Sequence, residues 1–152
     1  MAIKMKTEVT LRAEACCPSH SRADIAIRDL RFAIDEPVAR GGTNAGPTPT
    51  DTALAALIGC TNVIGHKCAD ALGVDIGDLD IDAQCIFDRR GVTLEEEIAI
   101  PFRRIELTVR SHGPADEAAL QRVASEVRKY CPLSKLFTAA GTEIVEIWQK
   151  AP

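Results

Sequence analysis

Residues 52–72, TALAALIGCTNVIGHKCADAL, decide how this chain folds. The stretch is rich in helix formers, and apolar or small residues occupy almost the whole circumference of the helix it would form. A helix of that kind is buried on most sides, so we predict a central helix around which the rest of the chain packs. Asp51 or Thr50 suits its N-cap, and Gly73 suits its C-terminal stop.

Period-two alternation of apolar and polar residues predicts strands on both sides of this helix. Before it, residues 7–15 and residues 23–34 show the alternation, and we interpret them as the two strands of a hairpin. After it, the same alternation predicts three more strands, at residues 79–89, 103–110 and 142–148.

Two further helices are predicted at residues 115–130 and 132–140, from the spacing of their apolar residues and the acidic residues that open the first. The resulting order is strands, buried helix, strands, helices and strand, which is typical of the α+β class. A length of 152 residues is that of one ordinary domain. We therefore predict a single α+β domain over residues 1–152.

Charge and hydropathy exclude several classes of function. The 18 Lys and Arg against 22 Asp and Glu leave a net charge of −4, which is unlike the basic face of a nucleic-acid-binding protein. The longest uncharged stretch, residues 52–66, is too short to span a bilayer, and no apolar run of signal-peptide length follows the first residues. We expect a cytoplasmic protein that binds neither nucleic acid nor a membrane.

Six cysteines require an explanation: Cys16, Cys17, Cys60, Cys68, Cys85 and Cys131. No C-x-x-C pair and no paired histidines accompany them, so we expect no metal site. A disulfide framework is disfavoured because the chain is long enough to bury a core without one. Buried reduced thiols, catalytic thiols, or a mixture remain, and we favour the mixture.

Cys131 stands out because Pro132 follows it and suits the first position of a helix. Cys131 would then be the N-cap, where backbone N–H groups and the helix dipole lower a cysteine pKa. It is a candidate reactive thiol, and the alternative is a small buried cysteine at a corner between helices. Cys68 lies roughly 12 Å along the central helix from Cys60, beyond the reach of a disulfide, so we interpret it as structural. Cys85 is a core residue by its phase in the strand.

Three stretches together resemble the OsmC/Ohr family of osmotically inducible proteins and organic hydroperoxide resistance proteins. They are GGTNAGPTP at residues 41–49 leading into LAALIGCT at 54–61, the turn DEP at 35–37, and YCPLSK at 130–135. The resemblance runs over nearly the entire chain. It implies an OsmC-like fold with antiparallel sheets packed around the central helix, in an intertwined homodimer with two sites at the interface.

The resemblance also implies thiol-dependent reduction of organic hydroperoxides, with no cofactor. By this resemblance Cys60 is the thiolate that attacks the O–O bond and becomes a sulfenic acid, and Cys131 is the resolving thiol that forms a disulfide with it. A dithiol then regenerates the enzyme; in the best-known branch of the family this is a lipoylated protein.

Four further residues are assigned to the site by the resemblance. The family places an arginine from the first hairpin against the thiolate; Arg22 is the first candidate and Arg40 the second, with surface solvation as the alternative for both. Characterised hydroperoxidases have a glutamate directly after the proline that opens the central helix. Here Thr50 takes that place with Asp51 next, and we assign both to substrate binding.

The loss of that glutamate leaves two other interpretations open. A dimeric small-molecule-binding or redox-sensing protein would keep both thiols and have little peroxidase turnover. Chemistry on sulfur species at the same cysteine pair is a weaker alternative. The intact pair of Cys60 and Cys131 favours the peroxidase.

Overall fold

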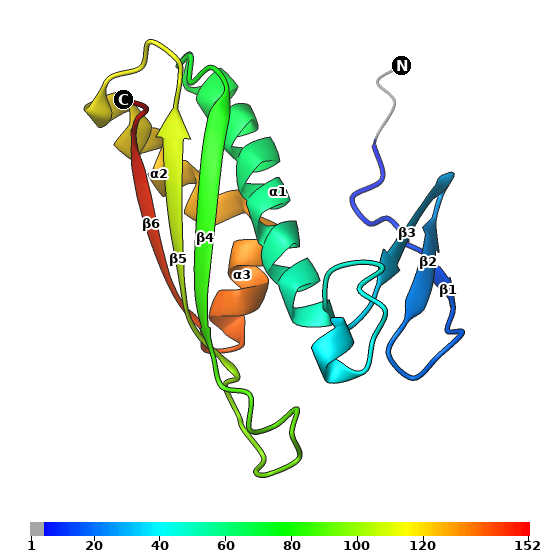
Figure 1. The fold of residues 1–152 in the computed structure, drawn as a ribbon. Coiled ribbons are helices and arrows are strands. Elements are labelled where there is room, and N and C mark those ends of the chain that lie inside the picture. Colours follow the sequence, from blue (N-terminus) through cyan, green and yellow to red (C-terminus); the bar gives the residue numbers. More distant parts are fainter. Residues whose placement is uncertain (1–4) are drawn as a thin grey trace. The chain divides into compact units, whose positions relative to one another are not determined.

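The computed structural model describes residues 5–152 (Figure 1). The chain forms two compact units, Met1–Thr52 and Ala53–Pro152. Two three-stranded sheets and three α-helices make up an α+β protein, as predicted. None of the helices in the described part of the chain is long and apolar enough to cross a membrane.

The first unit contains an antiparallel sheet of β1 (Glu14–Cys16), β2 (Ala23–Ile27) and β3 (Leu30–Ile34). The predicted strand at residues 7–15 was too long, because only its end pairs with β2. The predicted strand at residues 23–34 was wrong as one element, because it is two strands joined by a tight turn. Ile27 pairs with Leu30 across that turn, and Arg28 between them has the left-handed φ of 56°.

A glycine-rich loop follows β3 and is held around the buried carboxylate of Asp35. This carboxylate accepts hydrogen bonds from the N–H groups of Glu36, Thr43 and Ala45 at 2.8, 3.0 and 3.1 Å, and from the Thr43 hydroxyl at 2.6 Å. These hydrogen bonds hold the pKa of Asp35 well below its usual range. The bond from the Thr43 hydroxyl has the largest effect, and the backbone donors add to it. Gly46 is required nearby, because a Cβ there would lie 2.0 Å from the carbonyl oxygen of Ala33.

The helix predicted at residues 52–72 is α1 (Pro49–Ala71), which begins three residues earlier than expected. Its cap is Thr48, so the expectation that Thr50 or Asp51 would be the N-cap was wrong. The Thr48 hydroxyl accepts from the Asp51 N–H at 3.2 Å, and the Asp51 carboxylate accepts from the Thr48 N–H at 3.3 Å. This reciprocal pair is a capping box. Gly73, with φ of 67°, follows the end of the helix as predicted.

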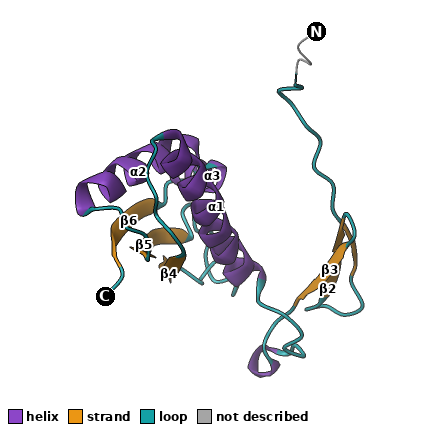
Figure 2. Cartoon of the chain, turned by 90° about the horizontal axis from the view of Figure 1, so that it is seen from above, coloured by secondary structure: helices purple, strands orange, loops and turns teal. Residues whose placement is uncertain are grey.

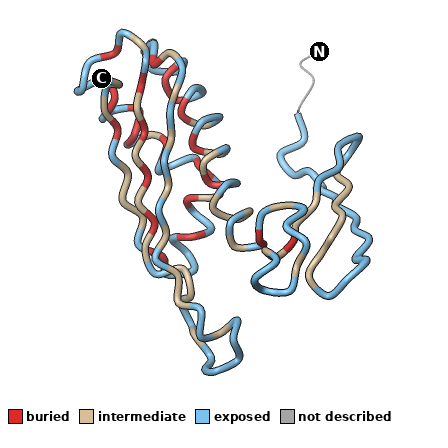
Figure 3. The backbone as a smooth tube through the Cα atoms, viewed as in Figure 1, coloured by how far each residue is buried: buried red, intermediate tan, exposed pale blue. Residues whose placement is uncertain are grey.

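The burial of α1 differs from the prediction, because one face of the helix is covered and the opposite face is open (Figure 3). The buried positions are Leu57, Thr61, Gly65, Cys68 and Ala69. The open face carries small and apolar residues: Ala55, Ala56, Gly59 and Val63. A face of this composition explains why the sequence alone suggested a helix buried on most sides.

The second unit packs three helices on one face of a sheet of β4 (Leu79–Phe87), β5 (Phe102–Ser111) and β6 (Glu143–Lys150). Figure 2 shows α1, α2 (Glu117–Tyr130) and α3 (Pro132–Ala139) on the same side of the strands. β4 and β5 are antiparallel, but β5 and β6 are parallel. The expected all-antiparallel arrangement was therefore wrong, because α2 and α3 form a crossover that returns the chain to the same end of the sheet.

The core of the second unit lies between this sheet and its helices. Many of its fully buried residues come from the central strand and the inner face of α2: Ile105, Leu107, Val109, Leu120, Val123 and Val127. Trp148 of β6 reaches α1 at Gly65, where a Cβ would lie 2.9 Å from its Cη2 atom. The helix that carries Cys60 is thus fixed to the sheet by a close contact that only glycine permits.

Candidate thiol site

Cys131 occupies the corner between α2 and α3 and is the N-cap of α3, as the sequence predicted. Pro132 takes the first helical position, and the Ser134 N–H donates to the Cys131 Sγ at 3.4 Å. The residue has no exposed surface. Both interpretations offered by the sequence therefore describe it: the thiol caps a helix, and it is a small buried residue between helices.

The expectation of a lowered Cys131 pKa was wrong. Burial removes the thiol from water and, together with the neighbouring Cys60, raises its pKa to about 11. The Ser134 N–H acts in the opposite direction, as the helix terminus should, but its effect is smaller. Burial therefore outweighs the helix terminus, and Cys131 is protonated at neutral pH.

Cys60 lies on α1, half-buried against the same core that contains Cys131. Its thiol is close enough to Cys131 for a charge on one sulfur to alter the ionisation of the other. Both cysteines are free, as are the other four. The second unit thus brings together a half-buried cysteine and a fully buried one, from elements far apart in the sequence.

The other cysteines do not share this arrangement. Cys68 is buried on α1 and Cys85 is half-buried on β4, and burial raises the pKa of each thiol. Cys85 packs against the core, as its phase in the strand predicted, and the structural role of Cys68 stays a prediction. Cys16 and Cys17 are exposed at the end of β1.

The two candidate arginines lie in the first unit, each beside a carboxylate. Arg22 Nε donates to Asp24 at 2.8 Å, and this contact raises the Arg22 pKa. Arg40 Nε donates to Glu36 at 2.6 Å, with the Arg40 side chain largely exposed. Both guanidinium groups are partly exposed and charged, and the choice between them remains a prediction.

Thr50 and Asp51 serve the start of α1. The Thr50 hydroxyl lies 3.1 Å from that of Thr48, and Asp51 accepts from the Thr48 hydroxyl at 2.7 Å. The Asp51 carboxylate is therefore already engaged by the capping box. Substrate binding by these two residues remains a prediction.

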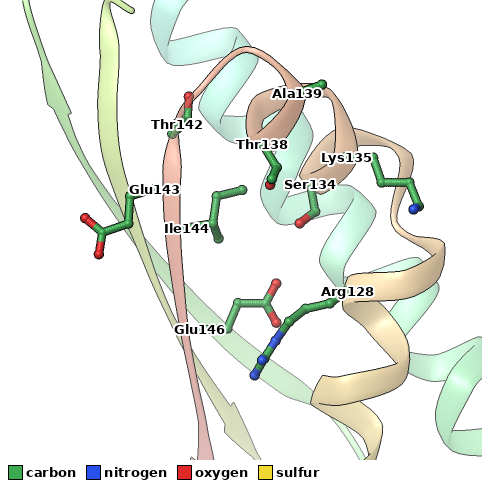
Figure 4. A pocket seen from close by; sticks show the side chains of 9 residues that line it. All are labelled: Arg128, Ser134, Lys135, Thr138, Ala139, Thr142, Glu143, Ile144 and Glu146. Atoms are coloured by element: carbon green, nitrogen blue, oxygen red, sulfur yellow. The ribbon is translucent and has the colours of Figure 1, made fainter.

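A pocket of about 710 Å³ lies between α3, the end of α2 and β6, and no sequence motif pointed to it (Figure 4). Glu146 lines it from β6, with one carboxylate oxygen accepting from Trp148 Nε1 at 3.1 Å. The other oxygen is buried without a partner among the described residues, and burial raises the Glu146 pKa. The sequence signal was available, because Glu146 shares the inward phase of Ile144 and Trp148 on β6.

Among the described residues, no group of three or more His, Cys, Asp or Glu side chains is placed to hold a metal ion. The arrangement instead offers thiol chemistry. A half-buried thiol beside a protonated buried one can be oxidised to a sulfenic acid and then close a disulfide.

The fold is shared with several solved structures. An OsmC-like protein from Mycoplasma pneumoniae superposes with a TM-score of 0.79 at 16% identity, covering 95% of this chain and 100% of that one. The organic hydroperoxide resistance protein OsmC from Legionella pneumophila gives 0.70 at 15% identity, with 96% and 100% covered. The organic hydroperoxide resistance protein OhrB of Bacillus subtilis gives 0.65 at 21% identity, with 92% and 98% covered.

Among curated proteins, none matches this chain in sequence. The sequence does match the OsmC-like protein family over residues 42–146, from the glycine-rich loop to the pocket residue of β6. That match covers more than half of the chain and includes both cysteines of the thiol site. The chain belongs to the OsmC-like protein family.

Proposed function

We propose that this protein is a cysteine-based peroxidase that reduces organic hydroperoxides through Cys60 and Cys131. The observation that carries the proposal is the adjacency of these two thiols, one half-buried and one fully buried. Family membership and the names of the Legionella and Bacillus structures support it at the level of hydroperoxide resistance.

The proposed reaction has three steps. The Cys60 thiolate attacks the outer oxygen of ROOH; the O–O bond breaks, the sulfur is oxidised to a sulfenic acid, and the alcohol ROH leaves after taking a proton. Cys131 then attacks the sulfenic sulfur, forming a disulfide and releasing water. A dithiol reduces the disulfide to two thiols and is itself oxidised to a cyclic or linear disulfide.

Arg22 or Arg40 supplies a positive charge to the Cys60 thiolate in this proposal, as the family resemblance implies. A fixed guanidinium charge lowers the pKa of a nearby thiol and so raises the thiolate fraction at neutral pH. Thr50 cannot provide the negative charge that orients the arginine in characterised hydroperoxidases. Asp51 is occupied by the cap.

This protein acts as a homodimer in the proposal, through the open face of α1. That face is made of small and apolar residues, and Val63 within it is half exposed. Nothing lies within 4 Å of a Cβ placed on Gly59, so a second helix can approach closely there. Val63→Glu places a charge in this face and is expected to convert a dimer to a monomer in sedimentation velocity experiments. An unchanged sedimentation coefficient would exclude this face as the interface.

A dithiol such as a lipoylated protein is the proposed reductant. The cytoplasm is the proposed location, because it keeps such thiols reduced.

A redox-sensing or small-molecule-binding protein with little turnover is the second candidate. The engagement of Asp51 by the cap and the absence of an acid at Thr50 favour it, because both remove the charge that would orient an arginine.

One experiment separates the two candidates. Reduced protein receives one equivalent of cumene hydroperoxide, and peptides are mapped by mass spectrometry for a disulfide between Cys60 and Cys131. Rapid formation that disappears in the Cys60→Ser variant supports the peroxidase, whereas an unmodified Cys60 at low oxidant excess would exclude it.

A further inference from the structure

The two cysteines of the thiol site differ in how far they are buried. Cys131 is 0% exposed, enclosed by the corner between α2 and α3, whereas Cys60 is half-buried on α1. Thiol–disulfide exchange requires the attacking sulfur to approach along the axis of the S–S bond, so access decides which sulfur is attacked. A reductant from outside can therefore reach one end of the disulfide only.

We propose that the regenerating dithiol attacks the Cys60 sulfur of the disulfide and that Cys131 is the leaving group. This inference rests on the proposed function for the existence of the disulfide. It assigns a direction to the reductive half of the cycle, which the peroxidase proposal leaves open.

The thiol–disulfide exchange takes place in two steps. A thiolate RS⁻ bonds to the Cys60 sulfur as the S–S bond breaks, and the electron pair of that bond leaves with Cys131. Cys131 then takes a proton and becomes a thiol again. The second thiol of the reductant attacks the sulfur that the reductant contributed to the mixed disulfide, which frees Cys60 and leaves the reductant oxidised.

The helix terminus gives the leaving sulfur a partner. The Ser134 N–H lies 3.4 Å from the Cys131 Sγ and, with the N-terminal end of α3, offsets part of the cost that burial imposes on a thiolate there. Access, rather than the quality of the leaving group, therefore sets the direction of attack. Once the charge is neutralised, burial keeps Cys131 protonated, since its pKa is raised to about 11. A protonated Cys131 is slow to attack the mixed disulfide again, so the second reductant thiol can complete the reaction.

Two properties of the reductant follow. It reaches the Cys60 end of the disulfide, as the proposed direction requires. It also carries two thiols, because a monothiol stops at the mixed disulfide until a second molecule arrives.

The test forms the disulfide with diamide, an oxidant that needs no peroxidase activity, in a Cys16→Ser/Cys17→Ser variant that lacks the two exposed thiols. The oxidised protein receives glutathione for short times and is quenched in acid. It is then denatured, alkylated with N-ethylmaleimide and mapped by peptide mass spectrometry. Ratios extrapolated to zero time exclude later migration of the adduct between the sulfurs.

We expect glutathione on Cys60 and N-ethylmaleimide on Cys131, with the Cys60 adduct in at least tenfold excess. Equal labelling, or glutathione mainly on Cys131, would overturn the inference, and so would failure of diamide to join the two cysteines. If diamide joins the pair and the direction holds, but hydroperoxide does not form the disulfide, only the peroxidase proposal fails. The two claims are therefore tested separately.

Discussion

Gly65→Ala tests whether the contact between α1 and β6 is as close as the structure shows. A Cβ at this position would lie 2.9 Å from Cη2 of Trp148, and Trp148 is 1% exposed, so its ring has little room to move. Overpacking of this kind costs about 1–3 kcal/mol. Replacing glycine by alanine inside a helix stabilises the helix by about 1 kcal/mol. We therefore expect the variant to be destabilised by up to about 2 kcal/mol.

The double-mutant cycle with Trp148→Phe isolates the steric part of this effect. Phenylalanine does not carry the Cη2 atom, so Gly65→Ala keeps its helix-propensity gain in that background and loses most of the clash. The predicted coupling is therefore about 1–3 kcal/mol, with the two substitutions less damaging together than their separate effects imply. Urea unfolding of the four proteins, followed by far-ultraviolet circular dichroism, measures it. If Gly65→Ala stabilises the parent protein and the Trp148→Phe variant equally, the close contact does not exist.

Three further predictions concern capping and protonation. Asp116→Ala removes the side chain that accepts from the Ala119 N–H at 2.8 Å at the start of α2, and should lower the free energy of unfolding by about 1 kcal/mol in urea titrations; no change would contradict this. Asp35 has a lowered pKa in the folded state, so its stabilising contribution is present above the unfolded value near pH 4 and lost as pH falls through the folded value. Asp35→Asn should therefore destabilise the glycine-rich loop at pH 7 and match the parent more closely in strong acid, as followed by amide exchange; a penalty that grows on acidification would refute this. The raised Cys131 pKa of about 11 predicts that closure of the disulfide on the Cys60 sulfenic acid accelerates about tenfold per unit between pH 7 and 10, and a flat stopped-flow profile would disprove it.

Local sequence patterns predicted the elements of the second unit well, because each has a strong periodic signal and a clear end. α2, α3 and β4 lie within a few residues of their predicted bounds, and Cys131 caps α3 as expected. Gly73 ends α1 for the same local reason, since a left-handed residue there needs no tertiary support.

The turn between β2 and β3 is encoded locally, by a shift in the positions of the apolar residues. The apolar phase moves from odd to even positions between Ile27 and Leu30, and this shift marks the two-residue turn that separates β2 from β3. Apolar and polar residues alternate on both sides of this turn, so the two strands resemble one continuous strand. The phase of the alternation, which decides which side of a sheet each residue faces, does not continue.

Tertiary effects could not be predicted from the same patterns. The Cys131 pKa depends on how completely the corner between α2 and α3 is buried, and burial reverses the direction that the helix terminus alone would give. The parallel pairing of β5 with β6 depends on where the crossover returns, which no strand encodes in its own residues. The adjacency of Cys60 and Cys131 was implied by family resemblance and is a property of the folded second unit.

Catalytic turnover tests the central claim most directly. The reduced protein is mixed with a hundredfold excess of cumene hydroperoxide and dihydrolipoamide, and peroxide loss, cumyl alcohol and oxidised lipoamide are measured together. We predict many turnovers per protein chain with the three quantities in a 1:1:1 ratio, abolished by Cys60→Ser and stalled by Cys131→Ser. Consumption of no more than one equivalent of peroxide, or equal turnover by the Cys60→Ser variant, would contradict the peroxidase proposal.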